Sequence, residues 1–185
     1  MEETYLEFFK KNMGEYLHTD KNTSHNYITE YYDKLFTSLR NTPLTILEIG
    51  NYRGDFLRLC RDYLLSKCTI VGIDINPYNG FLSEEKITFY KKDAYCQETL
   101  DMFPNDYFDI CIDDGSHKPE HQKYFLQNWI QKVKPGGRLI LEDVENMNLA
   151  SELMNSISSI SHKEGRIVNL ENPHYIFNII IEIIK

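Results

Sequence analysis

Hydrophobic and polar positions follow two different periods along the chain, and the switches between them predict strands separated by helices. Short apolar or β-branched runs bounded by turn residues indicate strands, whereas apolar residues three to four positions apart indicate amphipathic helices. The predicted strands are residues 45–50, 69–75, 86–92, 107–114, 138–144, 166–171 and 175–184. The predicted helices are residues 2–13, 25–40, 56–65, 119–133 and a segment near 147–160, with a short helix or turn at 97–103.

Local signals mark the ends of several elements. Gly14 suits a helix C-cap, Ser24 a helix N-cap and Pro119 the first turn of a helix. The sequences N-P-Y-N-G (76–80) and K-P-G-G (134–137) are typical of turns.

The alternation of strands and helices predicts an α/β fold. This order of elements builds a mostly parallel sheet of seven strands with helices on both faces. The last two runs are too close in sequence for a crossover helix, so we expect an antiparallel C-terminal hairpin at the edge of the sheet. Ligands of such sheets bind at the carboxyl ends of the strands.

Size and charge narrow the function classes. A chain of 185 residues corresponds to one domain and can bury a core without a disulfide or metal staple. The formal net charge of −8 argues against nucleic acid and anionic membranes as partners. No apolar run reaches the length of a membrane span and the acidic start lacks a secretory signal, so we expect a cytoplasmic protein. Without a C-x-x-C pair, the cysteines are interpreted as reduced core thiols: Cys60, Cys68, Cys96 and Cys111.

A glycine-containing loop follows the first predicted strand. Residues 48–54 have the pattern E-x-G-x-x-x-G, which matches neither the NAD fingerprint nor the P-loop. Glycines at Gly50 and Gly54 let the backbone turn tightly and approach a ligand closely. Asp74 ends the second strand, where a carboxylate can accept both hydroxyls of a ribose, and Asp93 follows the third strand, near where an adenine edge would lie. The simpler alternative is that both glycines are ordinary turn residues.

This combination resembles the class I S-adenosylmethionine-dependent methyltransferases, which have a Rossmann-like fold. The shared features are the E-x-G-x-x-x-G loop, the acids after the second and third strands, and K-P-G-G before the fifth. The resemblance implies S-adenosylmethionine as the cofactor. In the methyltransferase domain itself, the residues implied to contact it are Glu48, Gly50, Asn51, Gly54, Asp74, Ile75, Asp93, Ala94 and Asp113.

Acidic residues also gather at the ends of the fourth and fifth predicted strands. Asp113 and Asp114 end one strand and Glu142-Asp143 the other, and neighbouring strand ends would bring them together. Two carboxylates about 4 Å apart repel by roughly 4 kcal/mol at an effective dielectric constant near 20, so protons or a cation must relieve the repulsion. Mg²⁺ is the cation that such oxygen ligands favour. The alternative is that Asp113, Asp114 or Ser116 caps the helix beginning near Pro119.

His117 lies three residues beyond Asp114, in the loop over the same strand end. A neutral imidazole at that position could accept a hydroxyl proton at neutral pH, which makes His117 a candidate general base. His121, one helical turn further along, is interpreted as structural.

A narrower resemblance starts from the run I-D-D-G-S-H (112–117), followed by a long helix, K-P-G-G and L-E-D. With the N-terminal sequence H-T-D-K (18–21), then H-x-Y (25–27) and L-R-x-x-P (39–43), it is similar to the metal-dependent sugar O-methyltransferases of the macrocin and mycinamicin type. The resemblance covers residues 17 to about 145. It implies Asp114, Glu142 and Asp143 as metal ligands, Asp114 and His117 as catalytic residues with His117 the general base, and Thr19, Asp20 and Lys21 near cofactor or substrate, with Thr19 and Lys21 assigned to the cofactor.

The resulting hypothesis is an Mg²⁺-dependent O-methyltransferase that acts on a hydroxyl of a sugar or glycan. Residues 1–43 are expected to form an N-terminal helical or lid segment, and residues 44–185 the S-adenosylmethionine-binding domain, within one structural domain. A homodimer is compatible with the sequence. The alternatives are a catechol-type small-molecule O-methyltransferase and a catalytically silent cofactor-binding module. Methylation of nucleic acid is disfavoured, because no [DNS]-P-P-[YFW] follows the fourth strand.

Overall fold

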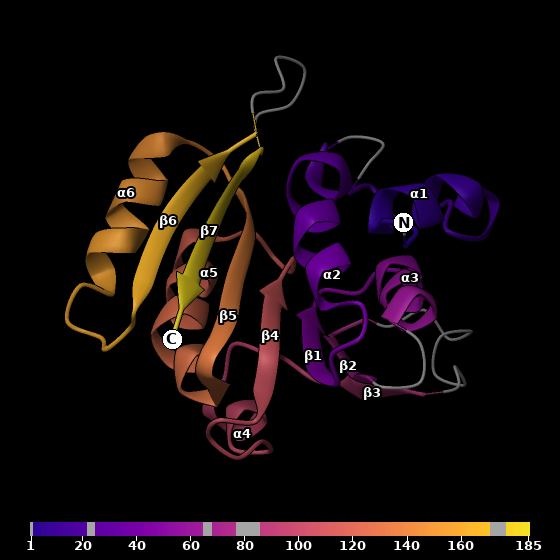
Figure 1. Cartoon of the computed structure of the whole chain (residues 1–185). Helices are drawn as coiled ribbons and strands as arrows, with labels where there is room; N and C mark the ends of the chain where they lie inside the picture. The colour runs from indigo at the N-terminus through magenta and orange to yellow at the C-terminus, as the bar shows by residue number, and fades with distance from the viewer. Residues whose placement is uncertain (1, 22–24, 65–67, 77–85, 171–176) are drawn as a thin grey trace.

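The structure is a computed structural model that describes residues 2–21, 25–64, 68–76, 86–170 and 177–185. Its centre is a seven-stranded sheet in the order β3-β2-β1-β4-β5-β7-β6, seen in Figure 1. The strands are β1 (Leu44–Ile49), β2 (Cys68–Asp74), β3 (Ile87–Lys91), β4 (Phe108–Asp113), β5 (Val133–Val144), β6 (Glu164–Asn169) and β7 (Ile179–Ile184). The first five strands, β1 through β5, are parallel to one another, and β7 is antiparallel to both β5 and β6. The predicted α/β sheet with its antiparallel C-terminal hairpin at the edge is therefore confirmed.

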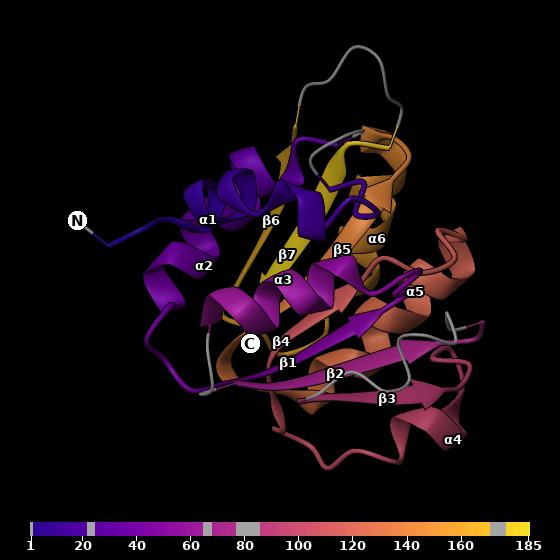
Figure 2. The same cartoon turned by 90° about the vertical axis from the view of Figure 1, so that its right-hand side faces the viewer.

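Helices cover both faces of the sheet (Figures 1 and 2). One face carries α1 (Tyr5–Lys11), α2 (Asp33–Leu39) and α3 (Asp55–Leu64), and the other carries α4 (Gln97–Leu100), α5 (Pro119–Asn128) and α6 (Met147–Ser156). Successive strand residues point to opposite faces. On β4, Ile110 and Ile112 accordingly pack with Phe36 and Tyr63, whereas Cys111 packs with Trp129 on the other side.

Several predicted helix ends differ from the structure. The first helix begins at Tyr5, because Thr4 and Glu7 form a reciprocal capping box. Its C-cap is Asn12, whereas the sequence predicted Gly14. The helix predicted at 25–40 is a π-helical turn (Ile28–Tyr32) that continues into α2. α5 does begin at Pro119, but its N-cap is Lys118, and none of the acids considered as caps fills that role. A 3₁₀ turn (Trp129–Lys132) follows α5, and another (Met13–Glu15) follows α1. Ser24 and most of the N-P-Y-N-G segment lie outside the described residues.

The turn predicted at K-P-G-G is wrong. These residues lie inside β5, where the pairing with β4 shifts register between Phe108 and Ile110. Gly136 has a φ of +79°, which a glycine adopts without steric cost, so the extra residues bulge while the strand continues.

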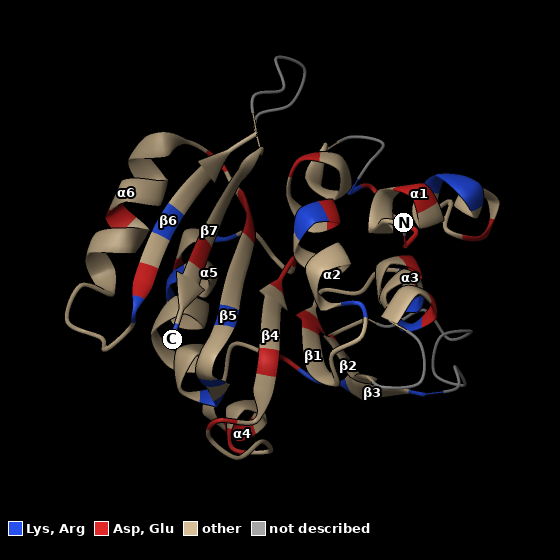
Figure 3. Cartoon of the chain, in the orientation of Figure 1, with Lys and Arg blue, Asp and Glu red and all other residues tan. Residues whose placement is uncertain are grey.

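The fold places the carboxyl ends of β1, β2, β4 and β5 at one edge of the sheet. The N-terminal helices pack beside α3, because their side chains share one hydrophobic core with it. Tyr5 and Phe36 contact Phe56 and Tyr63 of α3 in this core. Acidic positions mark the tips of β1 and β4 where they face the N-terminal helices (Figure 3). This edge is where the sequence-predicted site residues converge.

Candidate active site

The glycine loop is organised by the carboxylate at the end of β2. Asp74 Oδ2 accepts hydrogen bonds from the backbone N–H groups of Asn51 (2.8 Å) and Tyr52 (3.2 Å), and its Oδ1 accepts one from Asn76 (2.7 Å). Gly50 has a φ of +80°, and a Cβ there would lie 2.1 Å from the backbone oxygen of Asp114. Only glycine therefore allows the loop to pass this close to the end of β4.

Two cavities meet at this loop and share Gly50, Asp74 and Gly115 in their walls. The larger has a volume of about 520 Å³ and the smaller about 300 Å³, which is the range of small-ligand sites. Of the sequence-predicted residues, the larger cavity is lined by Thr19, Asp20, Lys21, Glu48, Gly50, Asn51, Asp74, Asp114 and His117. The smaller is lined by Gly50, Asp74, Ile75, Asp93 and Ala94. Gly54, Asp113, Glu142 and Asp143 lie outside both linings.

The smaller cavity has an aromatic wall that the sequence did not reveal. Tyr95 and His121 stack with ring centroids 4.2 Å apart. The Tyr95 hydroxyl donates to Asp113 Oδ1 (2.7 Å) and accepts the Ser116 N–H (3.2 Å). His121, interpreted from sequence as structural, therefore also lines a cavity; its stacking partner lies 26 residues away, beyond any local pattern.

Lys21 carries a buried ammonium among three carboxylates. Its Nζ lies 2.6 Å from Asp114 Oδ2, 3.5 Å from Glu48 Oε1, and in hydrogen-bond contact with Glu142 Oε2. The side chain is 2% exposed and its Nζ lies 4.6 Å from the centroid of the Phe56 ring. Asp114 and Glu142 accept hydrogen bonds from the ammonium, and Glu48 lies at ion-pair distance from it.

Burial dominates the electrostatics of this group. It raises the pKa of Glu48 to about 7 and that of Asp114 to about 6, and it raises the pKa of Glu142 well above its ordinary value. Burial alone would lower the pKa of Lys21, but the carboxylates of Asp114, Glu142 and Glu48 raise it, so the ammonium stays protonated. One ammonium cannot neutralise all of this acid, and a further cation would be stabilised at this edge.

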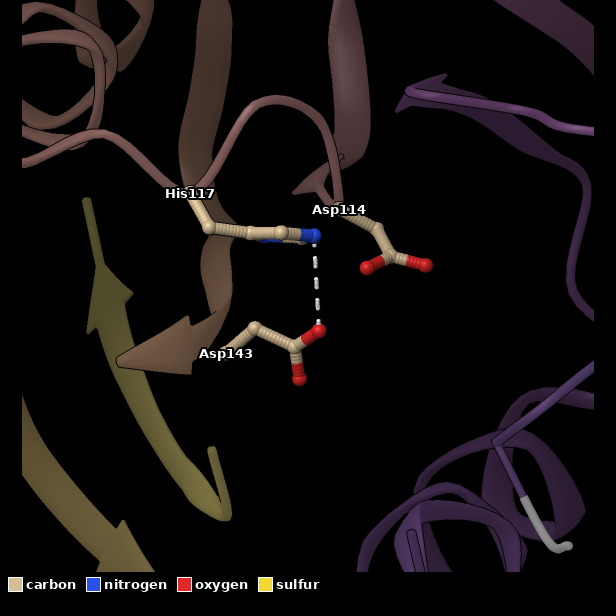
Figure 4. A group of neighbouring side chains, drawn as sticks. All are labelled: Asp114, His117 and Asp143. Carbon is tan, nitrogen blue, oxygen red and sulfur yellow. Dashed lines mark ion pairs between the residues drawn. The ribbon is translucent and has the colours of Figure 1, made fainter. Parts of the chain in front are cut away.

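Asp114, His117 and Asp143 converge beside this group (Figure 4). Each offers one ligand atom, and these atoms lie within 4.8 Å of one another. His117 Nε2 is 3.6 Å from Asp143 Oδ2, and both residues have a φ in the left-handed region, +56° and +54°. The two carboxylate oxygens suit a hard divalent cation such as Mg²⁺, and the imidazole lies beside them.

Glu142 is placed differently from the two aspartates. Its Oε1 accepts a hydrogen bond from the Tyr32 hydroxyl and its Oε2 binds Lys21, and the side chain is fully buried. The structure thus brings Asp114 and Asp143 together with His117, and directs Glu142 toward the N-terminal segment. Tyr27 and Tyr32, which contact the acids, belong to the predicted helix 25–40, and Tyr27 is also the tyrosine of the H-x-Y motif, but the sequence assigned a partner to neither residue.

The cysteines are free thiols, but only Cys60 and Cys111 are buried; Cys68 and Cys96 are half-buried, so the expectation of four core thiols is wrong in part. Within the described ranges, no helix is both long enough and apolar enough to cross a membrane.

Comparisons with known proteins agree with the geometry. Residues 47–144 match the family described as a methyltransferase domain. Demethylmacrocin O-methyltransferase from Streptomyces fradiae is 32% identical over 135 residues, which covers 68% of this chain and 34% of that protein. Mycinamicin VI 2''-O-methyltransferase from Micromonospora griseorubida is 31% identical over 128 residues, covering 64% of this chain and 32% of that protein. The chain spans about a third of the length of these curated relatives.

Solved structures show the same fold. MycE methyltransferase from the mycinamycin biosynthetic pathway, in complex with Mg and SAH, matches with a TM-score of 0.72 and 23% identity over 100% of this chain and 55% of that chain. An O-methyltransferase from Bacillus cereus in complex with SAH matches with a TM-score of 0.66 and 14% identity, over 100% of this chain and 92% of that chain.

Proposed function

The chain belongs to the methyltransferase domain family, and from this premise we propose that it is an S-adenosylmethionine- and Mg²⁺-dependent O-methyltransferase acting on a hydroxyl of a sugar or glycan. The observation that carries the proposal is the convergence of Asp114, His117 and Asp143 beside the cavities of the glycine loop. The sugar-modifying names of the relatives support the acceptor class.

The two joined cavities are the proposed cofactor site. The smaller, with apolar walls from Ile75 and Ala94 and the carboxylate of Asp93 at its edge, suits an adenine. Asp74 lies where both cavities meet, and backbone N–H groups occupy three of the four lone pairs of its carboxylate, so Oδ1 keeps one acceptor position for a ribose hydroxyl. The remaining assigned residues that line the larger cavity are Thr19, Lys21, Glu48, Gly50 and Asn51. Gly54 follows this loop in sequence, and Asp113 contacts Tyr95 in the wall of the smaller cavity. When bound, S-adenosylmethionine supplies an electrophilic methyl group on a sulfonium.

The proposed metal ligands are Asp114, Glu142 and Asp143. Asp114 and Asp143 already present oxygens to one point, whereas Glu142 would join them by releasing Lys21. A divalent ion held by these residues would lower the pKa of an acceptor hydroxyl and fix its direction.

His117 is the proposed general base. Its side chain is 36% exposed, so its imidazole can reach an acceptor, and its Nε2 lies 3.6 Å from Asp143 Oδ2. The imidazole accepts the hydroxyl proton as the acceptor oxygen bonds to the methyl carbon and the carbon–sulfur bond breaks. Orientation contributes much of the acceleration, because nucleophile, methyl carbon and leaving sulfur must be collinear.

A cytoplasmic location without nucleic-acid or membrane partners belongs to this proposal, and a homodimer is compatible with it. The second candidate is a catechol-type O-methyltransferase, which the same pair of metal-facing aspartates favours because a catechol also presents two adjacent oxygens. The third is a catalytically silent cofactor-binding module.

The test is methyl transfer from labelled S-adenosylmethionine to a panel of sugars, glycosides and catechols. Activity on a sugar hydroxyl that EDTA abolishes and Mg²⁺ restores is the expected result. Asp143→Asn should lose this activity, while Asp106→Asn, which removes an exposed partner of Lys185, should keep it. Undiminished turnover in chelator excludes the metal, turnover of catechols alone favours the second candidate, and no turnover with tight cofactor binding favours the third.

A further inference from the structure

The hydroxyl of Tyr27 makes two contacts with one residue at the end of β5. It lies 2.5 Å from Asp143 Oδ1, and it also accepts the backbone N–H of Asp143 (3.3 Å). Tyr27 is 1% exposed and comes from the N-terminal segment, 116 positions before Asp143. His25 stacks on the face of its ring with a centroid distance of 4.9 Å, and the His25 imidazole in turn contacts Asn178 Oδ1.

A phenol has one hydrogen to donate, so its acceptor decides what the contact does. The carbonyl oxygen of Phe177 lies 3.0 Å away and is neutral, whereas Asp143 Oδ1 lies closer and belongs to a carboxylate. Hydrogen bonds to ionised acceptors are shorter and stronger, so the hydrogen goes to Asp143. This bond occupies Oδ1 and leaves Oδ2 as the oxygen directed at His117 (Figure 4).

The backbone of Asp143 needs external support. Its φ of +54° lies in the left-handed region, which a residue with a Cβ occupies only where its surroundings enforce it. Tyr27 holds the N–H of Asp143, and Gln122 on α5 donates to its carbonyl oxygen (3.1 Å) and approaches that of Glu142 (3.4 Å). Tyr27 and Gln122 therefore hydrogen-bond to the N–H and to the carbonyl oxygen of the same strained residue.

We propose that Tyr27 is a positioning residue that selects which oxygen of Asp143 faces the metal site, with Gln122 holding the same residue from α5. The proposal rests on the proposed metal-dependent function. Residues that orient a metal ligand through a hydrogen bond alter metal affinity about 10–100-fold when they are removed.

The experiment compares Tyr27→Phe with a matched control, Tyr63→Phe. Tyr63 is also fully buried, and its hydroxyl donates to the backbone oxygen of Glu3 (3.0 Å) and to none of the acids of the site. Mn²⁺ affinity is measured by electron paramagnetic resonance on the chelator-treated full chain, with thermal midpoints recorded for each protein. Hydrogen exchange of the peptide containing Asp143 is a second readout that needs no metal.

The expected result is an Mn²⁺ affinity about 10–100-fold weaker in Tyr27→Phe, with faster exchange at Asp143, and wild-type values for both in Tyr63→Phe. Gln122→Met should also weaken Mn²⁺ affinity and speed exchange at Asp143. If Tyr27→Phe does not fold, Gln122→Met alone tests whether holding Asp143 sets the metal affinity. Wild-type Mn²⁺ affinity in both Tyr27→Phe and Gln122→Met overturns the positioning role and leaves the metal site standing. An absence of Mn²⁺ binding in the wild type overturns the metal site itself, and the positioning role with it.

Discussion

The β1–β2 half of the sheet edge is organised by backbone groups, whereas the β4–β5 half is organised by side chains from the N-terminal segment. In the first half, Asp74 accepts hydrogen bonds from three backbone N–H groups within 23 positions of it. In the second half, Lys21, Tyr27 and Tyr32 reach acids that lie 93 to 121 positions later.

The two halves of the edge therefore depend on different parts of the chain for their structure. A loop held by backbone N–H groups depends on glycine and on one acid, and it can form wherever β1, β2 and α3 form. A group of buried carboxylates depends on every donor that faces it, because each unpaired charge in a protein interior is costly. The N-terminal segment is therefore a structural part of the acidic half, and it reaches the other half through the ion pair of Lys21 with Glu48 on β1.

The largest expected effect is on chemistry in the acidic half. His117→Ala should lower kcat for methyl transfer by about 10²–10⁴-fold, because the acceptor proton loses its base. The affinity for S-adenosylhomocysteine, measured by calorimetry, should change much less than kcat, since His117 lines the larger cavity without being one of the proposed cofactor ligands. His162→Ala, whose imidazole contacts the carbonyl oxygen of Ile160 away from the edge, is the control. A change confined to KM would mean that His117 binds the acceptor and does not take its proton.

The next effect is on stability. Lys21→Met should lower the free energy of unfolding by about 3–5 kcal/mol, because it leaves Glu48, Asp114 and Glu142 without their buried cation. Denaturant unfolding monitored by fluorescence measures this loss. Lys92→Met removes an exposed pair with Glu98 and should change little. An equal, small effect of both substitutions would show that the buried ammonium does not hold the acidic half together.

The smallest effect is on the backbone-organised half. Asp74→Ala should weaken S-adenosylhomocysteine binding about 10–100-fold, since a hydrogen bond to a charged group contributes about 1.5–3 kcal/mol. Calorimetry with Asp101→Ala as control tests this, because Asp101 is exposed, lines neither cavity and accepts a side-chain hydrogen bond from Gln97. Unchanged affinity in Asp74→Ala would mean that the ribose is held elsewhere.

The same contrast explains how far the sequence could be interpreted. The succession of strands and helices along the chain and the glycine loop follow from local patterns, since alternation and turn residues act over a few positions. The K-P-G-G turn was predicted wrongly because a bulge within a strand needs the same residues as a turn, and only pairing with β4 distinguishes them.

Within the site, the sequence predicted that Asp113, Asp114, Glu142 and Asp143 converge, with His117 nearby. The structure brings Asp114, His117 and Asp143 together, because neighbouring strand ends meet, whereas Asp113 contacts Tyr95. The sequence could not assign partners to Lys21, Tyr27 and Tyr32. Their contacts depend on how the N-terminal helices pack on the sheet, which no spacing within residues 18–32 encodes. For the same reason Glu142, adjacent to Asp143 in sequence, could not be distinguished from it, although its side chain faces Lys21 and Tyr32.

The most direct test of the account is a titration of the chelator-treated protein with Mn²⁺, followed by electron paramagnetic resonance, for wild type, Asp143→Asn and Asp74→Asn. We expect the wild type and Asp74→Asn each to bind one Mn²⁺ per chain, and Asp143→Asn to bind none at the same concentrations. Equal binding by wild type and Asp143→Asn, or no binding by the wild type, would contradict a metal centre at the ends of β4 and β5.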